Sequence, residues 1–291
     1  MMRGDTGRPP VNKTDYSHLD PSPFSSGHAA DQDLVCQVTL DGRAFLRSSG
    51  TRWELPRVAD LPSDSLPTPE NRHRWMDAGR LGTERLLAML ADGDSPPGLT
   101  PVSMRQLVLE DDSVWRVVAR VQQVLFWLRR HRFCGVCGAE LTQGDVERHL
   151  RCPACGNVEY PMAASATITA IVRGDQLLLA RNISRRHPFY SLVAGFVEPG
   201  ETLEQCAVRE VKEEVGLVVT DPQYLFSQPW PFPSTLMAGF TVRSETGEVA
   251  VDGVEIGDAR WFTADQLPEV PPAGTIARRI IDAWLSGDLP A

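Results

Sequence analysis

The stretch GFVEPGETLEQCAVREVKEEVGL, from Gly195 to Leu217, decides the fold of the second half of this chain. A glycine is followed by five residues and Glu201, and then by seven residues and the run REVKEEVGL that begins at Arg209. So many fixed positions at fixed spacings seldom coincide by chance. The stretch therefore indicates a functional motif, in which a loop leads into a helix.

The second half of this stretch has the pattern of a capped amphipathic helix. Thr202 and Gln205 fit a T-x-x-Q capping box at its start. Gly216 is suited to end the helix, because glycine adopts the left-handed conformation without strain. Apolar residues recur every fourth position and are expected to face a core: Leu203, Ala207, Val211 and Val215.

Three carboxylates crowd one side of the predicted helix, since Glu210 and Glu214 lie one turn apart with Glu213 beside them. Unpaired carboxylates at this density repel each other, and a bound hard divalent cation would relieve the repulsion. Mg²⁺ prefers oxygen ligands and keeps waters and substrate phosphates in its shell. Arg209 can pair with Glu201 or Glu213 and hold the loop against the helix. An ordinary solvated acidic helix would not need this framing.

Four cysteines upstream have the spacing of a zinc ribbon. Cys134 and Cys137 form one C-x2-C pair, Cys152 and Cys155 form a second, and a glycine follows each pair. Four thiolates close a tetrahedral structural zinc site and leave no open position for catalysis. Disulfides are the competing interpretation, and they are disfavoured in a chain without a secretion signal. A redox C-x-x-C ordinarily occurs singly.

Composition limits the class of protein. The formal net charge of −9 argues against a nonspecific nucleic-acid binder, although it leaves room for a specific RNA end. No apolar run approaches membrane-spanning length, and the first residues lack the pattern of a signal peptide. A cytoplasmic enzyme with no membrane association is expected.

The order of patterns along the chain predicts four segments. Residues 1–30 are rich in Pro, Ser, Gly and Asp and are expected to be a disordered tail. Residues 31–130 are expected to form an α+β domain, residues 131–160 the zinc ribbon, and residues 161–291 an α/β domain.

Secondary structure can be predicted within these segments. In the first domain we expect a hairpin over 34–47, a short helix over 83–91, a strand over 104–109 and a longer helix over 114–130. In the last domain we expect a closing helix over 275–285, in addition to the helix of the Gly195–Leu217 stretch. Six strands are expected there, over 166–173, 176–180, 192–196, 224–227, 236–242 and 259–262.

A second motif, SQPWPFPST, runs from Ser227 to Thr235. Its three prolines fix φ at alternate positions and bias each preceding residue towards extended conformations. The result is a stiff arch that presents Gln228, Trp230 and Phe232 in set directions. Flat apolar faces beside one amide suit a planar base or a nicotinamide ring. A purely structural proline–aromatic corner is the alternative.

Together these motifs resemble a known family. The first stretch matches the Nudix box, G-x5-E-x7-R-E-U-x-E-E-x-G-U with U aliphatic, and with the second motif the chain closely resembles the NADH pyrophosphatase family of Nudix hydrolases. Thr235 stands where the family pattern has serine. The resemblance extends to the four-cysteine ribbon, to Tyr160 and Pro161, and to PPAGTIARRI over residues 271–280. It covers residues 100–285 well and the N-terminal domain weakly.

The resemblance implies a fold and a set of site residues. The fold is the Nudix α/β/α sandwich with a mixed sheet. Divalent cations, Mg²⁺ or Mn²⁺, would be held by Glu210, Glu214 and Glu255 with the main-chain carbonyl of Ala194. Glu213 would assist as ligand or base, with Glu255 as the other candidate base. Residues implied to contact the dinucleotide are Gln228, Pro229, Trp230, Pro231, Phe232, Pro233, Ser234, Thr235, Tyr160, Arg105, Glu147 and Ala277.

The resemblance also implies a function. The expected reaction is metal-dependent hydrolysis of the pyrophosphate bond in NADH or NAD⁺ to nicotinamide mononucleotide and AMP, with NAD-capped RNA 5′ ends as a further substrate and a homodimer as the working form. One alternative is a Nudix hydrolase of ADP-ribose or dinucleoside polyphosphates, which the arch disfavours. The other is a zinc-ribbon nucleic-acid-binding regulator with an inactive Nudix sensor. The intact carboxylates and the acidic balance count against that regulator.

Overall fold

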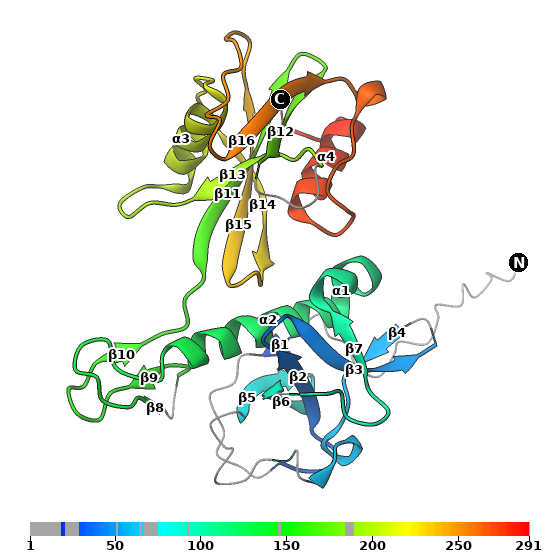
Figure 1. Cartoon of the computed structure of the whole chain (residues 1–291), viewed down its shortest axis with the longest axis vertical. Helices are drawn as coiled ribbons and strands as arrows, with labels where there is room; N and C mark the ends of the chain where they lie inside the picture. The colour runs from blue at the N-terminus through cyan, green and yellow to red at the C-terminus, as the bar shows by residue number, and fades with distance from the viewer. Residues whose placement is uncertain are drawn as a thin grey trace, which may run out of the picture. The chain divides into compact units, whose positions relative to one another are not determined.

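The computed structural model describes residues 19–20, 29–50, 52–63, 66, 75–91, 93–144, 147–183 and 189–290. The chain divides into two units, residues 1–161 and 162–291 (Figure 1). The tail expected over residues 1–30 lies almost wholly outside the described residues, and within it Leu19–Asp20 forms the two-residue strand β1. Among the described residues, no helix has the length and hydropathy that crossing a membrane would require.

The first unit contains a mixed sheet followed by two helices. Its strands run in the order β1-β5-β6-β2-β3-β4, and β7 pairs with β3. The parallel neighbours are β2 and β6. The elements are β2 (Leu34–Thr39), β3 (Arg43–Ser49), β4 (Arg52–Glu54), a 3-10 turn (Val58–Asp60), β5 (Trp75–Leu81), β6 (Glu84–Ala91), β7 (Thr100–Ser103), α1 (Met104–Glu110) and α2 (Asp112–Arg130).

The expected hairpin over 34–47 and the expected helix over 114–130 are confirmed by β2, β3 and α2. Asp41 and Gly42 form the hairpin turn, where Gly42 has φ 81° and donates its N–H to Thr39 O at 3.1 Å. A positive φ of this size is one that glycine adopts without strain.

Two predictions in this unit are wrong. The helix expected over 83–91 is instead strand β6 (Glu84–Ala91), although ERLLAMLA is composed of good helix formers. The segment is buried between β5 and β2, and this tertiary pairing overrides the local propensity. Residues 104–109 form helix α1, because the Ser103 side chain caps the helix by accepting a hydrogen bond from Gln106 N.

The zinc-ribbon segment follows α2 and forms a small three-stranded antiparallel sheet. Its strands are β8 (Thr142–Gln143), β9 (Leu150–Arg151) and β10 (Val158–Glu159), in the order β10-β9-β8. Just before β8, Phe133 forms a bridge to Glu140.

The second unit is built on a mixed sheet in the order β14-β15-β11-β12-β16, with β13 paired to β11. The central pair β11 and β15 is parallel, and the other pairs are antiparallel. The elements are β11 (Ala164–Arg173), β12 (Gln176–Asn182), β13 (Val193–Phe196), α3 (Leu203–Val215), β14 (Gln223–Trp230), β15 (Thr235–Arg243), β16 (Ile256–Phe262), a 3-10 turn (Ala264–Gln266) and α4 (Ile276–Ser286).

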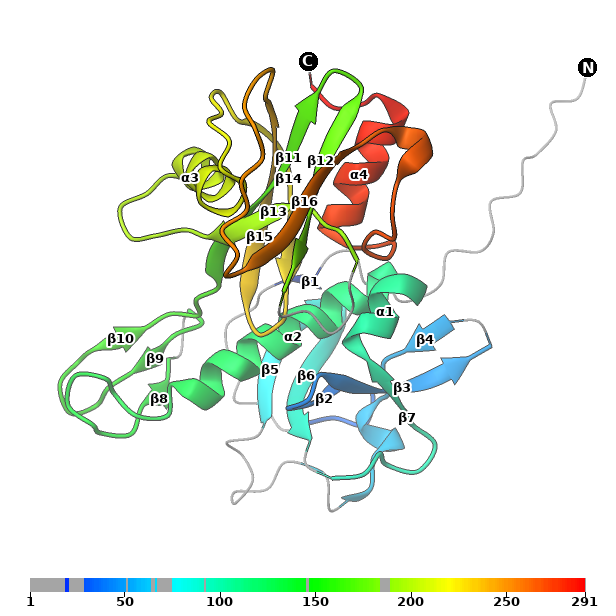
Figure 2. The same cartoon turned by 45° about the horizontal axis from the view of Figure 1, so that its top comes forward.

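The two helices of this unit cover opposite faces of its sheet (Figure 2). Side chains alternate between faces along a strand. In β12, Leu177 and Leu179 accordingly pack in the core that contains Ile280 of α4. Leu178 lies in the other core, with Val211 of α3. The predicted α/β/α sandwich with a mixed sheet is therefore confirmed.

Candidate active site and cysteine cluster

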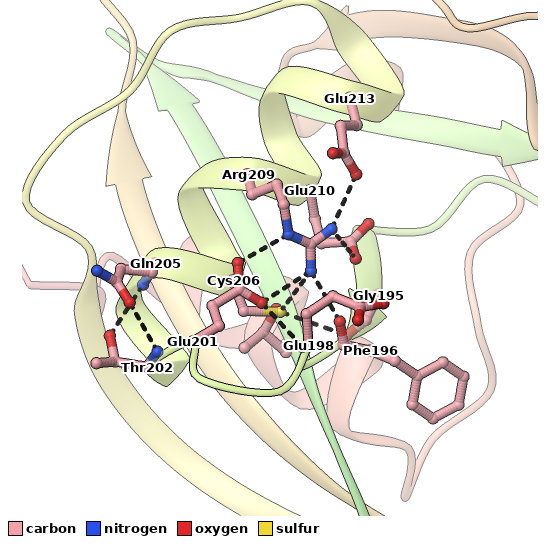
Figure 3. Close-up of polar contacts among 11 residues, drawn as sticks. Gly195, Phe196, Glu198, Glu201, Thr202, Gln205, Cys206, Arg209, Glu210 and Glu213 are labelled. Atoms are coloured by element: carbon pink, nitrogen blue, oxygen red, sulfur yellow. Dashed lines mark hydrogen bonds and ion pairs between the residues drawn. The ribbon is translucent and has the colours of Figure 1, made fainter.

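Helix α3 begins and ends as its sequence predicts. Thr202 Oγ1 accepts a hydrogen bond from Gln205 N at 3.2 Å, and Gln205 Oε1 accepts one from Thr202 N at 2.9 Å (Figure 3). At the other end Gly216 has φ 73°. Ala207, Val211 and Val215 are fully buried. Packing of this face fixes the rotation of the helix and hence the direction of its carboxylates.

Arg209 connects the loop to the carboxylates of α3 (Figure 3). Its Nε and Nη2 donate to the two carboxylate oxygens of Glu201, at 2.8 and 2.9 Å. Its Nη1 donates to Glu210 Oε1 and to Glu213 Oε2, both at 2.8 Å, and Nη2 also donates to Phe196 O at 2.8 Å. The expected pairing is confirmed for both Glu201 and Glu213. These hydrogen bonds lower the pKa of Glu201 and raise that of Arg209.

Gly195 lies directly against the carboxyl group of Glu210. A Cβ placed on Gly195 would lie 1.9–2.1 Å from the three carboxyl atoms of Glu210. Such distances are far inside van der Waals contact. A side chain at Gly195 would therefore displace the Glu210 carboxylate from its present position.

Glu214 is a carboxylate enclosed by protein. It is 6 % exposed, and its pKa is raised to about 8. Burial is the largest cause, followed by the negative charges of Glu210, Glu255 and Asp252, while a hydrogen bond from the Ala194 main chain opposes the rise. Burial likewise raises the pKa of Glu210, against the effect of Arg209. The cluster is therefore suited to receive positive charge.

The loop that carries Glu255 is held beside the end of α3 by Asp252. The Asp252 carboxylate accepts hydrogen bonds from the N–H groups of Val254 at 3.2 Å, Glu255 at 3.1 Å and Ile256 at 2.9 Å. Its own N–H donates to Glu214 O at 3.3 Å. The sequence analysis did not single out Asp252 as a residue that positions the site. The Asp-Gly pair at 252–253, which is typical of a turn, was the signal that could have identified it.

The arch continues strand β14 and turns back into β15, so that Trp230 pairs with Thr235. The rings of Trp230 and Phe232 meet edge to face, with centroids 5.1 Å apart at 61°. Ser234 Oγ donates to Met162 O at 3.4 Å. Main-chain pairing and the ring contact therefore fix the arch, as the prolines predict.

Gln228 is buried at the base of the arch, with 5 % of its surface exposed. Its Nε2 donates to Gly274 O at 2.8 Å, just before α4. Its Oε1 is buried without a hydrogen-bond partner among the described residues. That oxygen is an available acceptor. Ala277 of α4, also predicted to contact a ligand, is 6 % exposed and belongs to the core on that face of the sheet.

The remaining predicted contact residues lie in the first unit. Tyr160 is 52 % exposed, and its hydroxyl donates to Glu147 Oε2 at 3.3 Å. The structure thus brings these two residues together. Arg105 is exposed on α1.

The four cysteines form a tight cluster, with their Sγ atoms all within 4.8 Å of one another. The two C-x2-C turns are built alike. In each, the N–H of the glycine after the pair donates to the carbonyl of the first cysteine, at 2.9 Å for Gly138 and 3.0 Å for Gly156. Main-chain N–H groups lower the pKa of Cys134 and bring that of Cys152 to about 6. This donor set fits a tetrahedral metal ion.

Two family models match this chain, one over the second unit and one over the cysteine cluster. The family model of the NUDIX domain matches residues 162–285, and that of the NADH pyrophosphatase zinc ribbon domain matches residues 129–160. The chain is 44 % identical over 191 residues to the NAD-capped RNA hydrolase NudC of Stutzerimonas stutzeri, covering 65 % of this chain and 69 % of that protein. It is 36 % identical over 262 residues to the protein of the same name from Deinococcus radiodurans, covering 88 % and 89 %.

Proposed function

This chain belongs to the Nudix hydrolases that carry an NADH pyrophosphatase zinc ribbon, and from that premise we propose that it hydrolyses the pyrophosphate bond of NADH and NAD⁺ and removes NAD caps from RNA. The products are nicotinamide mononucleotide and either AMP or the 5′-phosphorylated RNA. The observation that carries the proposal is the carboxylate cluster of α3, where Glu210 and Glu213 are anchored by Arg209 and Glu214 is buried beside them.

The residues present fit a divalent cation, because a buried carboxylate with a raised pKa lies among three further acidic side chains. We propose that Glu210, Glu214 and Glu255, with the carbonyl of Ala194, hold Mg²⁺ or Mn²⁺. Bound cations neutralise the diphosphate and activate a water molecule. Arg209 keeps Glu210 and Glu213 in place, and Asp252 holds the loop of Glu255 beside Glu214.

We propose that the arch binds one planar end of the dinucleotide. Trp230 and Phe232 offer aromatic faces, and Gln228 Oε1 is an acceptor that can orient a ligand amide or amine. Tyr160, Glu147, Arg105 and Ala277 remain predicted contacts of the substrate.

Phe232→Ala is expected to lower kcat/KM for NADH by about tenfold to a hundredfold, because stacking on an aromatic side chain is worth roughly 1–3 kcal/mol per ring. ADP-ribose lacks the nicotinamide. It should be affected less if Phe232 contacts the nicotinamide and equally if it contacts the adenine. Tyr224→Ala removes an exposed ring from β14, the strand that leads into the arch, and should leave kcat/KM for both substrates within about twofold. Wild-type rates for Phe232→Ala and Trp230→Ala would make the arch purely structural.

We propose that Cys134, Cys137, Cys152 and Cys155 hold one structural zinc ion. Cys152→Ser should lose zinc and lower the unfolding temperature by roughly 10 °C, because metal binding contributes directly to folding free energy. The kcat of the protein that remains folded should change little, since the closed site is not catalytic. As a control, Val136→Ser alters an exposed residue of the other C-x2-C turn and keeps all four thiolates. Elemental analysis without zinc, together with disulfides in the mass spectrum, would contradict the assignment.

We further propose that the protein works as a homodimer in the cytoplasm, as its family resemblance implies. Light scattering tests the dimer. One assay separates the candidate functions, namely kcat/KM for NADH, NAD⁺, ADP-ribose and NAD-capped RNA with Mg²⁺ and with Mn²⁺. A higher kcat/KM for ADP-ribose than for NADH would favour the alternative hydrolase. No turnover of any of these substrates, with either Mg²⁺ or Mn²⁺, would favour a regulator.

A further inference from the structure

A group of four exposed arginines and one exposed phenylalanine lies in and next to the zinc ribbon, although the whole chain carries a net charge of −9. We call it the ribbon arginine surface, and it comprises Arg129, Arg130, Arg132, Phe133 and Arg151. All four arginines are exposed, and Phe133 is 58 % exposed. The hydrolysis proposed above uses none of these residues.

The fold gathers these residues from two places in the sequence. Arg129 and Arg130 form the last turn of α2, and Arg132 and Phe133 follow directly. Phe133 bridges to Glu140, and Thr142 pairs with Arg151. Paired residues share a face of a sheet, as do residues two apart along a strand. Glu140 and Thr142 are two residues apart, so Phe133, Glu140 and Arg151 lie on the same face of the ribbon.

The helix end alone does not explain this surface. Cations in a last helical turn interact favourably with the helix dipole, which accounts for Arg129 and Arg130. Arg132, Phe133 and Arg151 lie beyond the helix. The guanidinium of Arg132 lies 5.4 Å from the centroid of the exposed Phe133 ring. Its ion pair with Glu140 is long, at 3.7 Å, and both partners are more than half exposed. Such a pair contributes little stability.

Arginines interleaved with an exposed aromatic ring match the chemistry of single-stranded nucleic acid. Arginine neutralises phosphates, and a flat ring stacks on an unpaired base without regard to its identity. A base in a double helix is already stacked on its neighbours and is not available to Phe133. An acidic peptide would use the charges but would have no need of the exposed ring.

We propose that the ribbon arginine surface binds the single-stranded RNA that follows the NAD cap, through its phosphates and one stacked base. This inference rests on the proposed function and extends it from the cap to the body of the substrate. Free NADH carries no RNA chain. Hydrolysis of NADH therefore reports on the active site alone, and hydrolysis of capped RNA reports on the active site and on this surface.

The test compares kcat/KM for NADH and for an unstructured RNA with a 5′ NAD cap. The first variant carries Arg129→Gln, Arg130→Gln, Arg132→Gln and Arg151→Gln together. We expect its kcat/KM for the capped RNA to fall at least about tenfold at moderate salt, with NADH within about twofold. The slope of log kcat/KM against log salt should become shallower by about 2–3, because each phosphate contact on a single strand contributes about 0.7.

A second variant isolates stacking. Phe133→Leu keeps an apolar side chain and removes the ring, and it should lower kcat/KM for the capped RNA about fivefold or more without changing the salt slope. The matched control replaces Arg43, Arg52, Arg80 and Arg116 by glutamine. These exposed arginines lie elsewhere in the first unit, and the control changes net charge equally. Zinc content and unfolding temperature are measured for every variant.

The outcomes separate the two proposals. Wild-type protein that does not hydrolyse NADH with either cation would overturn the proposed function itself. Normal NADH hydrolysis with unchanged capped-RNA rates in the four-arginine variant would overturn only the inference. An equal loss on both substrates, or an equal loss in the control, would also overturn it. Full capped-RNA activity in Phe133→Leu, with a loss in the four-arginine variant, would overturn the stacked base and leave contacts to phosphates alone.

Discussion

Glu214→Gln is expected to lower kcat by about a hundredfold or more at saturating cation, with the fold intact. The change is isosteric and removes one negative charge from the most buried carboxylate of α3, which is 6 % exposed. Because electrostatic stabilisation of the transition state is lost, the effect should fall mainly on kcat. Steady-state kinetics with NADH and a cation titration measure it.

A matched control lies on the same helix. Glu204 is exposed in the first turn of α3, and Glu204→Gln should keep wild-type activity. Glu214→Gln should also leave the cation-free protein at least as stable as wild type, because a neutral amide needs neither the burial of a charge nor the uptake of a proton on folding. More than about a tenth of wild-type kcat in Glu214→Gln would contradict the assigned role.

Gly195→Ala is expected to have an effect of comparable size, for a steric reason. Its methyl group would occupy the position of the Glu210 carboxyl, at 1.9–2.1 Å, so Glu210 must leave the cluster or β13 must shift. If Glu210 holds the proposed cation, its displacement by about 1 Å is enough to cost roughly a hundredfold in rate. Activity should fall while zinc content stays at the wild-type value.

The control for this change is Gly135→Ala. Among the described residues, no neighbouring atom lies within 4 Å of the position that a Cβ on Gly135 would take, and Gly135 needs no positive φ. The same added methyl group should therefore be tolerated there. A crystal structure of Gly195→Ala would show where Glu210 moves. An unaltered kcat in this variant would mean that the approach of Gly195 to Glu210 is not needed for activity.

The sequence predicted the second unit well because its signals are local and mutually consistent. Thr202, Gln205 and Gly216 mark the ends of α3, and the regular apolar spacing selects its buried face. The fixed spacing of the carboxylates then places Glu210, Glu213 and Glu214 together. Arg209 could be assigned partners because the residues one helical turn away, and those of the preceding loop, are few.

Prediction failed where tertiary pairing decides. Residues 84–91 have helical composition, and they become a strand because β2 and β5 flank them. The role of Asp252 was invisible for a different reason, since it depends on three main-chain N–H groups that converge only in the folded loop. The raised pKa of Glu214 likewise follows from burial, which the acidic sequence around it does not suggest.

The burial of Glu214 has a consequence for proton linkage. Its folded pKa of about 8 exceeds the value of an exposed glutamate, so between these values the cation-free folded state holds a proton that the unfolded chain has released. The contribution of the protonated Glu214 to the free energy of unfolding is fully present below the unfolded pKa and is lost as the pH rises through about 8. At about 1.4 kcal/mol per pKa unit, it is on the order of a few kcal/mol.

Urea unfolding of protein dialysed free of Mg²⁺ and Mn²⁺ should therefore show lower stability at pH 9 than at pH 6, and Glu214→Gln should flatten this dependence. Binding of the proposed cation at Glu214 near neutral pH would release this proton, so that pH and the free cation concentration would act on the protein as one coupled variable.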